Sequence, residues 1–171
     1  MHKEVLQEFI TFYDRNQEVL DNGTVAELGS YDINGNLKKY IRNSVGFDIL
    51  EGPNVNVIIE PGIIPDEHKN KYQVVISISS FQFCPYPEVY KKEILDLLCD
   101  QGLLFLTMCS TECKGFHTTS PNDYKYEDSI RMSHKELNDF FGNDFEIFEI
   151  YDPILIDSES HNDTILRAKK K

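Results

Sequence analysis

Hydrophobic and polar residues alternate with helical spacing at the start of the chain. Apolar side chains recur every three or four residues between positions 2 and 20, at Val5, Leu6, Phe9, Ile10, Phe12 and Tyr13. A helix with this spacing buries one apolar face and exposes a polar one. Asn22 and Gly23 follow, and we expect them to end the helix.

Short apolar runs rich in β-branched residues come next, separated by turn residues and helical stretches. Helical spacing predicts a brief helix over 37–41 and a longer one over 87–99. The run at 103–108 is apolar almost throughout, as in a strand buried on both faces of a parallel sheet. The runs that predict strands span residues 24–28, 45–50, 55–59, 73–78 and 103–108.

The last third of the chain predicts one helix and two strands. Ser133 and Glu136 have the spacing of a capping box, which predicts a helix that continues to Phe141. Residues 145–151 and 164–168 have the pattern of strands, and the segment between them contains proline, aspartate and serine. This connection is too short for a helix of ordinary length, so we expect the two strands to be antiparallel.

Strands that alternate with helices indicate a doubly wound sheet. We therefore predict an α/β fold, a three-layer αβα sandwich whose sheet is mostly parallel with a C-terminal antiparallel strand pair. The chain has 171 residues, a length that suits one domain. We see no internal repeat and no linker, so we expect residues 1–171 to form a single domain.

Charge and cysteine spacing argue against several kinds of protein. The chain carries 17 lysine and arginine residues against 29 aspartate and glutamate residues, a net charge of −12, which disfavours nucleic acid as a partner. No apolar run approaches the roughly 20 residues that span a bilayer, so we expect no membrane segment and a cytoplasmic location. The four cysteines form no CxxC pair, so we expect free thiols and no metal site.

The residues that follow the predicted strands carry the candidate chemistry, because ligands of open parallel sheets bind at the carboxyl ends of the strands. Gly29, after the first strand, lets a ligand approach the backbone closely. Asp48, after the second, lies 19 positions beyond Gly29, where an acidic side chain can accept hydrogen bonds from a ribose diol. Glu60 follows the third strand and Ser79 the fourth. Together they predict a nucleoside pocket.

Two stretches of this sequence resemble the class I S-adenosylmethionine-dependent methyltransferases, particularly the small members. The first strand and its turn read VAELGSYDINGNL, and the fourth strand reads VVISISSF. The resemblance runs from about residue 24 to residue 110, and the last two predicted strands resemble the terminal antiparallel hairpin of that family. It implies that S-adenosylmethionine is the cofactor and that the chain transfers a methyl group.

The resemblance also implies roles for the strand-end residues. The methionine moiety would lie against the turn from Glu27 to Ser30, the ribose against Asp48, and the adenine edge against Glu60. Ser79 and Phe81 would line the methyl-transfer side. The implied cofactor-binding residues are Glu27, Gly29, Ser30, Asn34, Gly35, Asp48, Ile49, Glu60, Ser79 and Phe81.

The polar insert after the fifth strand supplies candidate catalytic residues. Its segments around His117 and from Pro121 to Tyr124 resemble the corresponding segment of the small methyltransferases. We expect His117 to act as a general base, Asp123 to orient it and Tyr124 to shape the acceptor pocket. A solvated surface histidine is the alternative for His117. The insert size favours a small-molecule acceptor.

The remaining histidines lack a comparable sequence context, and two other functions compete with methyl transfer. We expect the remaining histidines, His2, His68, His134 and His161, to be solvated. A nicotinamide-dependent oxidoreductase could also use Asp48, but the GxGxxG spacing of pyrophosphate-binding turns is absent. A non-catalytic cofactor- or partner-binding module is the second alternative. It is favoured by Phe81-Gln82-Phe83, where many family members carry an acidic residue followed by histidine. The sequence leaves the oligomeric state open.

Overall fold

The computed structural model describes residues 2–32, 35–112, 129–154 and 163–171. These residues form one seven-stranded sheet with the strand order β3-β2-β1-β4-β5-β7-β6, in which only β7 runs antiparallel to its neighbours. The strands are β1 (Val25–Leu28), β2 (Val45–Asp48), β3 (Val57–Ile58), β4 (Tyr72–Ile78), β5 (Leu98–Cys109), β6 (Phe145–Tyr151) and β7 (Asp163–Lys170). The predicted mostly parallel sheet with a C-terminal antiparallel pair is confirmed.

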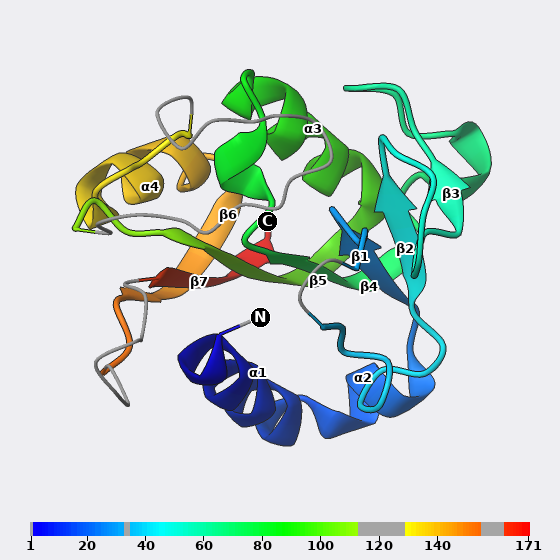
Figure 1. Cartoon of the computed structure of the whole chain (residues 1–171), viewed down its shortest axis with the longest axis horizontal. Coiled ribbons are helices and arrows are strands. Elements are labelled where there is room, and N and C mark those ends of the chain that lie inside the picture. The colour runs from blue at the N-terminus through cyan, green and yellow to red at the C-terminus, as the bar shows by residue number, and fades with distance from the viewer. Residues whose placement is uncertain (1, 33–34, 113–128, 155–162) are drawn as a thin grey trace.

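Helices cover both faces of this sheet, which confirms the predicted three layers. In Figure 1, α1 and α2 lie on one face, and α3 and α4 lie on the other. The helices are α1 (Lys3–Arg15), α2 (Gln17–Asn22), α3 (Pro87–Leu97) and α4 (His134–Phe141), with short 3-10 turns η1 (Asp66–His68) and η2 (Phe81–Phe83).

Two of the predicted helices differ in the structure. The predicted single helix over 2–20 is divided into α1 and α2 at Asn16, whose φ of −127° and ψ of 24° are not helical. The Asn16 side chain donates a hydrogen bond to the Phe12 carbonyl (2.8 Å), which satisfies the end of α1. The prediction of a helix over 37–41 is wrong, because this segment forms a hydrogen-bonded turn. Its apolar residues Leu37 and Ile41 are nevertheless buried.

The helix α4 begins as the sequence predicts. The Ser133 hydroxyl accepts a hydrogen bond from the Glu136 backbone N–H (3.3 Å), and the Glu136 carboxylate accepts one from the Ser133 N–H (2.8 Å). This reciprocal pair satisfies two backbone donors that a helix start otherwise leaves unpaired. The predicted capping box is confirmed.

Apolar cores lie on both faces of the sheet. Leu104 and Leu106 of β5 belong to the core under α3 and α4, whereas Phe105 belongs to the core under α1. The Phe105 ring meets Phe9 and Phe12 of α1, with ring centroids 5.7 and 5.0 Å apart. β5 is therefore buried on both faces, as its apolar run predicts.

Cysteine chemistry differs from the prediction at one residue. Cys84 and Cys99 have free thiols, but Cys109 is disulfide-bonded, and its partner lies outside the described residues. The expectation of free thiols throughout is thus wrong for Cys109. Within the described ranges, no group of three or more His, Cys, Asp or Glu residues could hold a metal ion. No helix in this part of the chain is long and apolar enough to cross a membrane.

Candidate functional site

The carboxyl ends of β1, β2 and β4 meet at the centre of the sheet. β1 pairs in parallel with β2 on one side and with β4 on the other. After β1 the chain adds β2 and β3 on one side of it, and then returns to add β4 on the other side, so the direction of strand addition reverses at β1. This switch point is where doubly wound sheets bind ligands.

Gly29 lies directly after β1 and has a left-handed φ of +75°. A Cβ atom at this position would lie 1.8 Å from the Ser80 hydroxyl oxygen and 2.2 Å from the Ser80 Cβ. Since a side chain cannot occupy that space, only glycine lets the loop after β1 approach the loop after β4 so closely. The Gly29 and Ser30 N–H groups also donate to the Phe47 carbonyl (2.9 and 3.1 Å), which ties the loop to β2.

A buried tyrosine beneath Gly29 joins the ends of β1 and β4. The Tyr90 hydroxyl of α3 donates to the Leu28 carbonyl (3.1 Å) and lies 2.8 Å from the Ser77 hydroxyl. Burial raises the pKa of Tyr90 well above its ordinary value, so the hydroxyl stays protonated and can donate. Nothing in the local pattern predicted this role. Its only signal is a tyrosine on an inward face of a helix, where the hydroxyl needs a partner.

Asp48 ends β2, and its carboxylate faces the loop after β1. One carboxylate oxygen accepts the Tyr31 N–H (3.0 Å), and the other accepts the Leu50 N–H (3.1 Å). Each carboxylate oxygen has a second lone pair, so the half-buried group can still accept hydrogen bonds from a diol. Ile49, beside it, is 44% exposed and offers an apolar surface for a flat base.

Glu27, by contrast, directs its buried carboxylate at the protein. It accepts hydrogen bonds from the Ser44 hydroxyl and the Asn54 amide (3.3 Å), and the Lys38 ammonium is 3.5 Å away. These contacts join β1 to the segments before and after β2. Ser30 is also buried, and its hydroxyl oxygen has no hydrogen-bond partner among the described residues.

The turn after β3 carries the predicted adenine-edge residue Glu60, which is exposed. Gly62 in this turn has a φ of +81°. Its N–H donates to the buried Glu93 carboxylate of α3 (2.6 Å). Burial raises the pKa of Glu93 above its ordinary value. Glu93 holds the turn in place from 31 residues away, which no local pattern could predict.

Of the predicted residues after β4, Ser79 lies at the site and Phe81 lies in the core. Ser79 has a left-handed φ of 52°, uncommon for a non-glycine residue, and its N–H lies within hydrogen-bond distance of the Thr107 carbonyl and hydroxyl (3.0 and 3.1 Å). Phe81 is fully buried, with its ring against Tyr90 and Phe141 at centroid distances of 5.5 and 5.8 Å. The expectation that Phe81 lines the methyl-transfer side is therefore corrected: η2 places its ring in the core.

Some predicted site residues fall beyond what the structure describes. Asn34, His117, Asp123 and Tyr124 lie outside the described residues. Gly35 is described, with a φ of +101° and its N–H donating to the Asp32 carboxylate (2.8 Å). Of the predicted set, the structure thus places Asp48 at the end of β2, and Gly29, Ser30, Ile49 and Ser79 directly after β1, β2 and β4.

Three histidines expected to be solvated have side-chain partners. His2 Nδ1 lies 2.7 Å from an Asp163 carboxylate oxygen, and His134 Nε2 lies 2.9 Å from one of Asp152. His68 Nδ1 lies 2.7 Å from the Tyr72 hydroxyl. His134 is nevertheless exposed, as predicted, whereas His2 and His68 are partly buried, so the prediction is wrong for these two.

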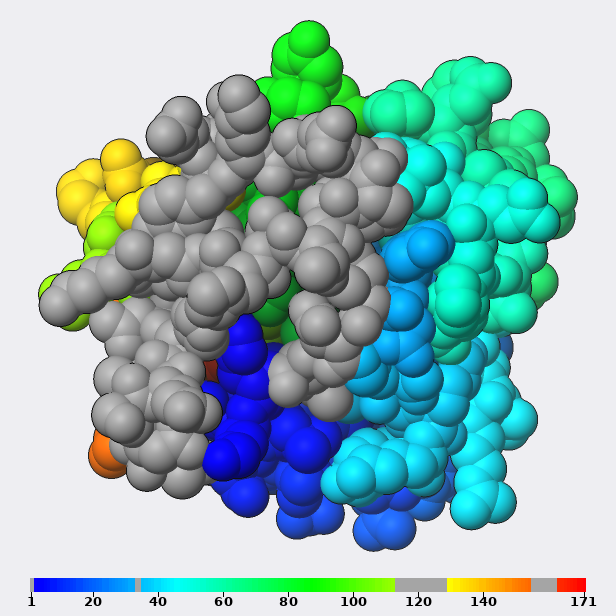
Figure 2. Space-filling view, viewed as in Figure 1, coloured from blue at the N-terminus to red at the C-terminus, as the bar shows by residue number. Residues whose placement is uncertain are grey.

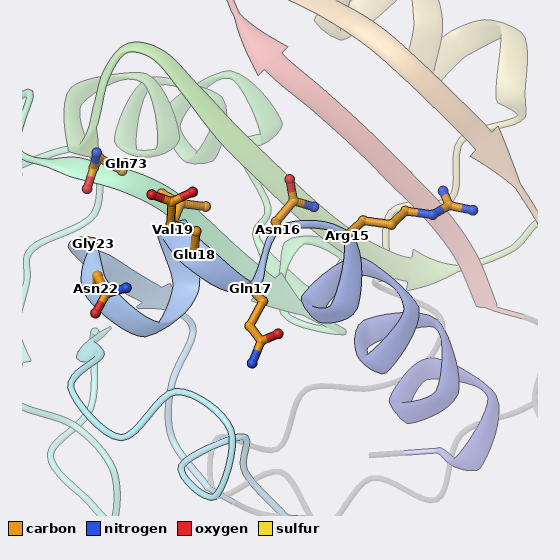
Figure 3. A pocket seen from close by; sticks show the side chains of 8 residues that line it. All are labelled: Arg15, Asn16, Gln17, Glu18, Val19, Asn22, Gly23 and Gln73. Atoms are coloured by element: carbon orange, nitrogen blue, oxygen red, sulfur yellow. The ribbon is translucent and has the colours of Figure 1, made fainter.

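A polar groove of about 430 Å³ lies away from this site, at the junction of α1 and α2 (Figure 3). Gly23 and Gln73, which line it, lie at the amino ends of β1 and β4. The groove is thus at the opposite edge of the sheet from Gly29 and Asp48. It is not the predicted nucleoside pocket.

Comparisons with known proteins agree on the fold. No protein-family model and no curated protein matches the sequence. A methyltransferase structure from Thermotoga maritima, described as S-adenosylmethionine-dependent and a possible histamine N-methyltransferase, superposes with a TM-score of 0.62 at 16% identity over 98% of this chain and 99% of that one. A methyltransferase from Methanosarcina mazei superposes with a TM-score of 0.63 at 12% identity, over 86% of this chain and 92% of that one. One from Aquifex aeolicus gives a TM-score of 0.59 at 12% identity, over 92% of this chain and 90% of that one. The chain therefore has the class I methyltransferase fold.

Proposed function

We propose that this chain binds S-adenosylmethionine at the carboxyl ends of β1, β2 and β4 and transfers its methyl group to a small-molecule acceptor. One observation carries the proposal. On a sheet of the methyltransferase strand order, Gly29 brings the backbone close at the end of β1, and Asp48 presents acceptor oxygens at the end of β2. A close-approach turn beside a carboxylate is the arrangement that a nucleoside cofactor needs.

The residues around this point would hold each part of the cofactor. Asp48 accepts hydrogen bonds from the ribose hydroxyls, and the exposed side chain of Ile49 lies against the adenine ring. The backbone from Gly29 to Ser30 would contact the methionine moiety, and Ser79, after β4, would line the methyl-transfer side. S-adenosylmethionine supplies an electrophilic methyl group on a sulfonium centre. The protein's main task is then to align the acceptor with that group and to remove a proton.

His117, Asp123 and Tyr124 remain the proposed catalytic residues of the insert. His117 removes the acceptor proton, Asp123 orients the imidazole, and Tyr124 shapes the acceptor pocket. Support for these three comes from the sequence resemblance alone, since they lie outside the described residues. We also propose that the acceptor is a small molecule and that the protein is cytoplasmic.

Calorimetry with the wild-type chain tests cofactor choice. We expect saturable binding of S-adenosylmethionine and of S-adenosylhomocysteine, its demethylated product. A nicotinamide dinucleotide is the matched control, because it also carries a ribose diol that could bind Asp48. A response to the dinucleotide alone would contradict the proposal. Cofactor binding without turnover in any pool of small-molecule acceptors would instead favour the non-catalytic module.

A further inference from the structure

We propose that Tyr90 of α3 is a positioning residue, whose hydroxyl sets the width of the crevice between the ends of β1 and β4 and thereby the affinity for S-adenosylmethionine. This inference rests on the proposed function, because it concerns the same binding site. Tyr90 is only 6% exposed and reaches the strand ends from the α3 side of the sheet. It therefore acts through the backbone of the site and does not touch the ligand.

The crevice begins where the pairing of β1 with β4 ends. The last paired residues of these two strands are Glu27 and Ile76. Beyond them, Leu28 of β1 pairs with β2, and Ser77 of β4 pairs with β5. The sheet thus divides between β1 and β4, at the switch point where doubly wound sheets bind ligands.

Tyr90 bridges this division at the next position of each strand. Its hydroxyl donates to the Leu28 carbonyl (3.1 Å) and lies 2.8 Å from the Ser77 hydroxyl. A tyrosine hydroxyl has one hydrogen to donate, so the Ser77 hydroxyl donates to the Tyr90 oxygen. One buried side chain therefore ties β1 to β4 just beyond the end of their backbone pairing.

The same hydroxyl lies close to the turn at Gly29. A Cβ atom at Gly29 would lie 3.2 Å from the Tyr90 hydroxyl oxygen and 1.8 Å from that of Ser80. The turn thus packs against two hydroxyl groups, one from α3 and one from the loop after β4. Figure 2 shows that the segments after β1 and β2 (light blue to cyan) reach the molecular surface. A shift of this turn would therefore change the surface that meets the cofactor.

The Tyr90→Phe variant isolates the hydroxyl. It keeps the ring, which packs against Phe81 at a centroid distance of 5.5 Å. It removes the donor to the Leu28 carbonyl, so the ends of β1 and β4 lose their side-chain tie. A turn that has been loosened must be ordered again when the ligand binds, and this ordering weakens binding.

A second buried tyrosine provides the matched control. Tyr72 is the first residue of β4, at the amino edge of the sheet, and is 2% exposed. Its hydroxyl lies 2.7 Å from His68 Nδ1. Tyr72→Phe therefore also removes a hydrogen bond of a buried tyrosine, but it leaves the carboxyl ends of β1 and β4 unchanged. Chemical denaturation should show a lower free energy of unfolding for both variants.

Calorimetry of the full-length proteins with S-adenosylmethionine and with S-adenosylhomocysteine tests the proposal. We expect Tyr90→Phe to bind both ligands about 3- to 10-fold more weakly than the wild type, the range for one lost hydrogen bond. Tyr72→Phe should bind them like the wild type. Ser77→Ala removes only the contact of Tyr90 with β4 and should weaken binding at least about 2-fold.

Wild-type affinity in a folded Tyr90→Phe protein would overturn the proposal and leave Tyr90 a purely structural residue. Equal losses of affinity in Tyr90→Phe and Tyr72→Phe would also overturn it, because the effect would then not depend on the strand ends. If Tyr90→Phe does not fold, wild-type affinity in Ser77→Ala would overturn it. Failure of the wild-type protein to bind either ligand would instead remove the proposed function itself.

Discussion

The site at the ends of β1, β2 and β4 and the contact between α1 and β7 are built in different ways. The site is shaped by backbone, with left-handed residues at Gly29 and Ser79 and hydrogen bonds from backbone N–H groups to Asp48. The contact between α1 and β7 is formed by charged side chains. The Arg167 guanidinium of β7 donates to Glu8 of α1 and to Glu149 of β6, both at 2.7 Å.

Two aromatic rings also contact the Arg167 guanidinium between α1 and the sheet. The Arg167 guanidinium lies over the Tyr151 and Phe105 rings, with distances of 5.6 and 5.9 Å to the centroids. The Tyr151 hydroxyl in turn donates to Glu8. Changes in the first region should therefore affect ligand binding, whereas changes in the second should affect stability and the docking of α1.

Loss of Arg167 should have the largest effect on stability. Arg167→Ala leaves Glu8 and Glu149 facing an emptied, largely buried position. We expect a loss of about 2–4 kcal/mol in the free energy of unfolding, less than for a fully buried pair because the two carboxylates are partly exposed. Chemical denaturation measures it. Lys135→Ala, which breaks the exposed Lys135–Asp139 pair, is the control and should change nothing measurable.

A methyl group at Gly29 should damage the site more than one at Gly35. Both glycines have positive φ, so either alanine substitution strains the backbone. Only at Gly29 would the new Cβ meet Ser80, since nothing lies within 4 Å of a Cβ at Gly35. We expect Gly29→Ala to lower cofactor affinity at least about 5-fold more than Gly35→Ala, because overpacking adds about 1–3 kcal/mol. Equal affinities of the two variants would show that the close approach is unimportant.

Asp48 should contribute directly to cofactor affinity. Asp48→Ala should weaken binding by about 1.5–3 kcal/mol, the range for hydrogen bonds to a charged group. Asp48→Asn retains one acceptor oxygen and should fall between the alanine variant and the wild type. Calorimetry measures affinity, and circular dichroism confirms folding. An Asp48→Ala protein that unfolds would show that the bonds to Tyr31 and Leu50 are the residue's main role.

The smallest predicted effect is a pH dependence of stability at Glu93. Burial raises the pKa of Glu93 in the folded state above the ordinary 4.5, so folding favours the protonated acid. The stabilisation that Glu93 contributes to the free energy of unfolding is complete below pH 4.5 and is lost as the pH rises through the folded-state pKa. The Glu93→Gln protein should lack this loss. We would compare unfolding free energies of the two proteins across that range. Parallel curves would contradict the prediction.

Much of the fold could be predicted because it depends on local pattern. Apolar runs located the strands, and the Ser133–Glu136 spacing located the start of α4. The break at Asn16 could not be predicted, because the apolar spacing of the first twenty residues continues through it. Leu37 and Ile41 have helical spacing, yet a stretch this short gains little from helix formation, and the turn buries both side chains.

The sequence predicts only those residues of the site whose positions follow from the order of the strands. Gly29 follows β1 and Asp48 ends β2, and parallel strands bring their carboxyl ends to one edge. Tyr90 and Glu93 act on the site from α3, over 62 and 31 positions, and the partner of His2 is 161 positions away. Such contacts are set by packing, which periodicity does not encode.

A crystal structure of the complex with S-adenosylhomocysteine would show where the cofactor binds. We expect the ligand to lie across the ends of β1, β2 and β4, with its ribose hydroxyls within hydrogen-bond distance of the Asp48 carboxylate. The backbone at Gly29 should lie against the methionine portion. A ligand bound in the groove between α1 and α2, or anywhere else that leaves Asp48 without a ribose contact, would contradict this expectation.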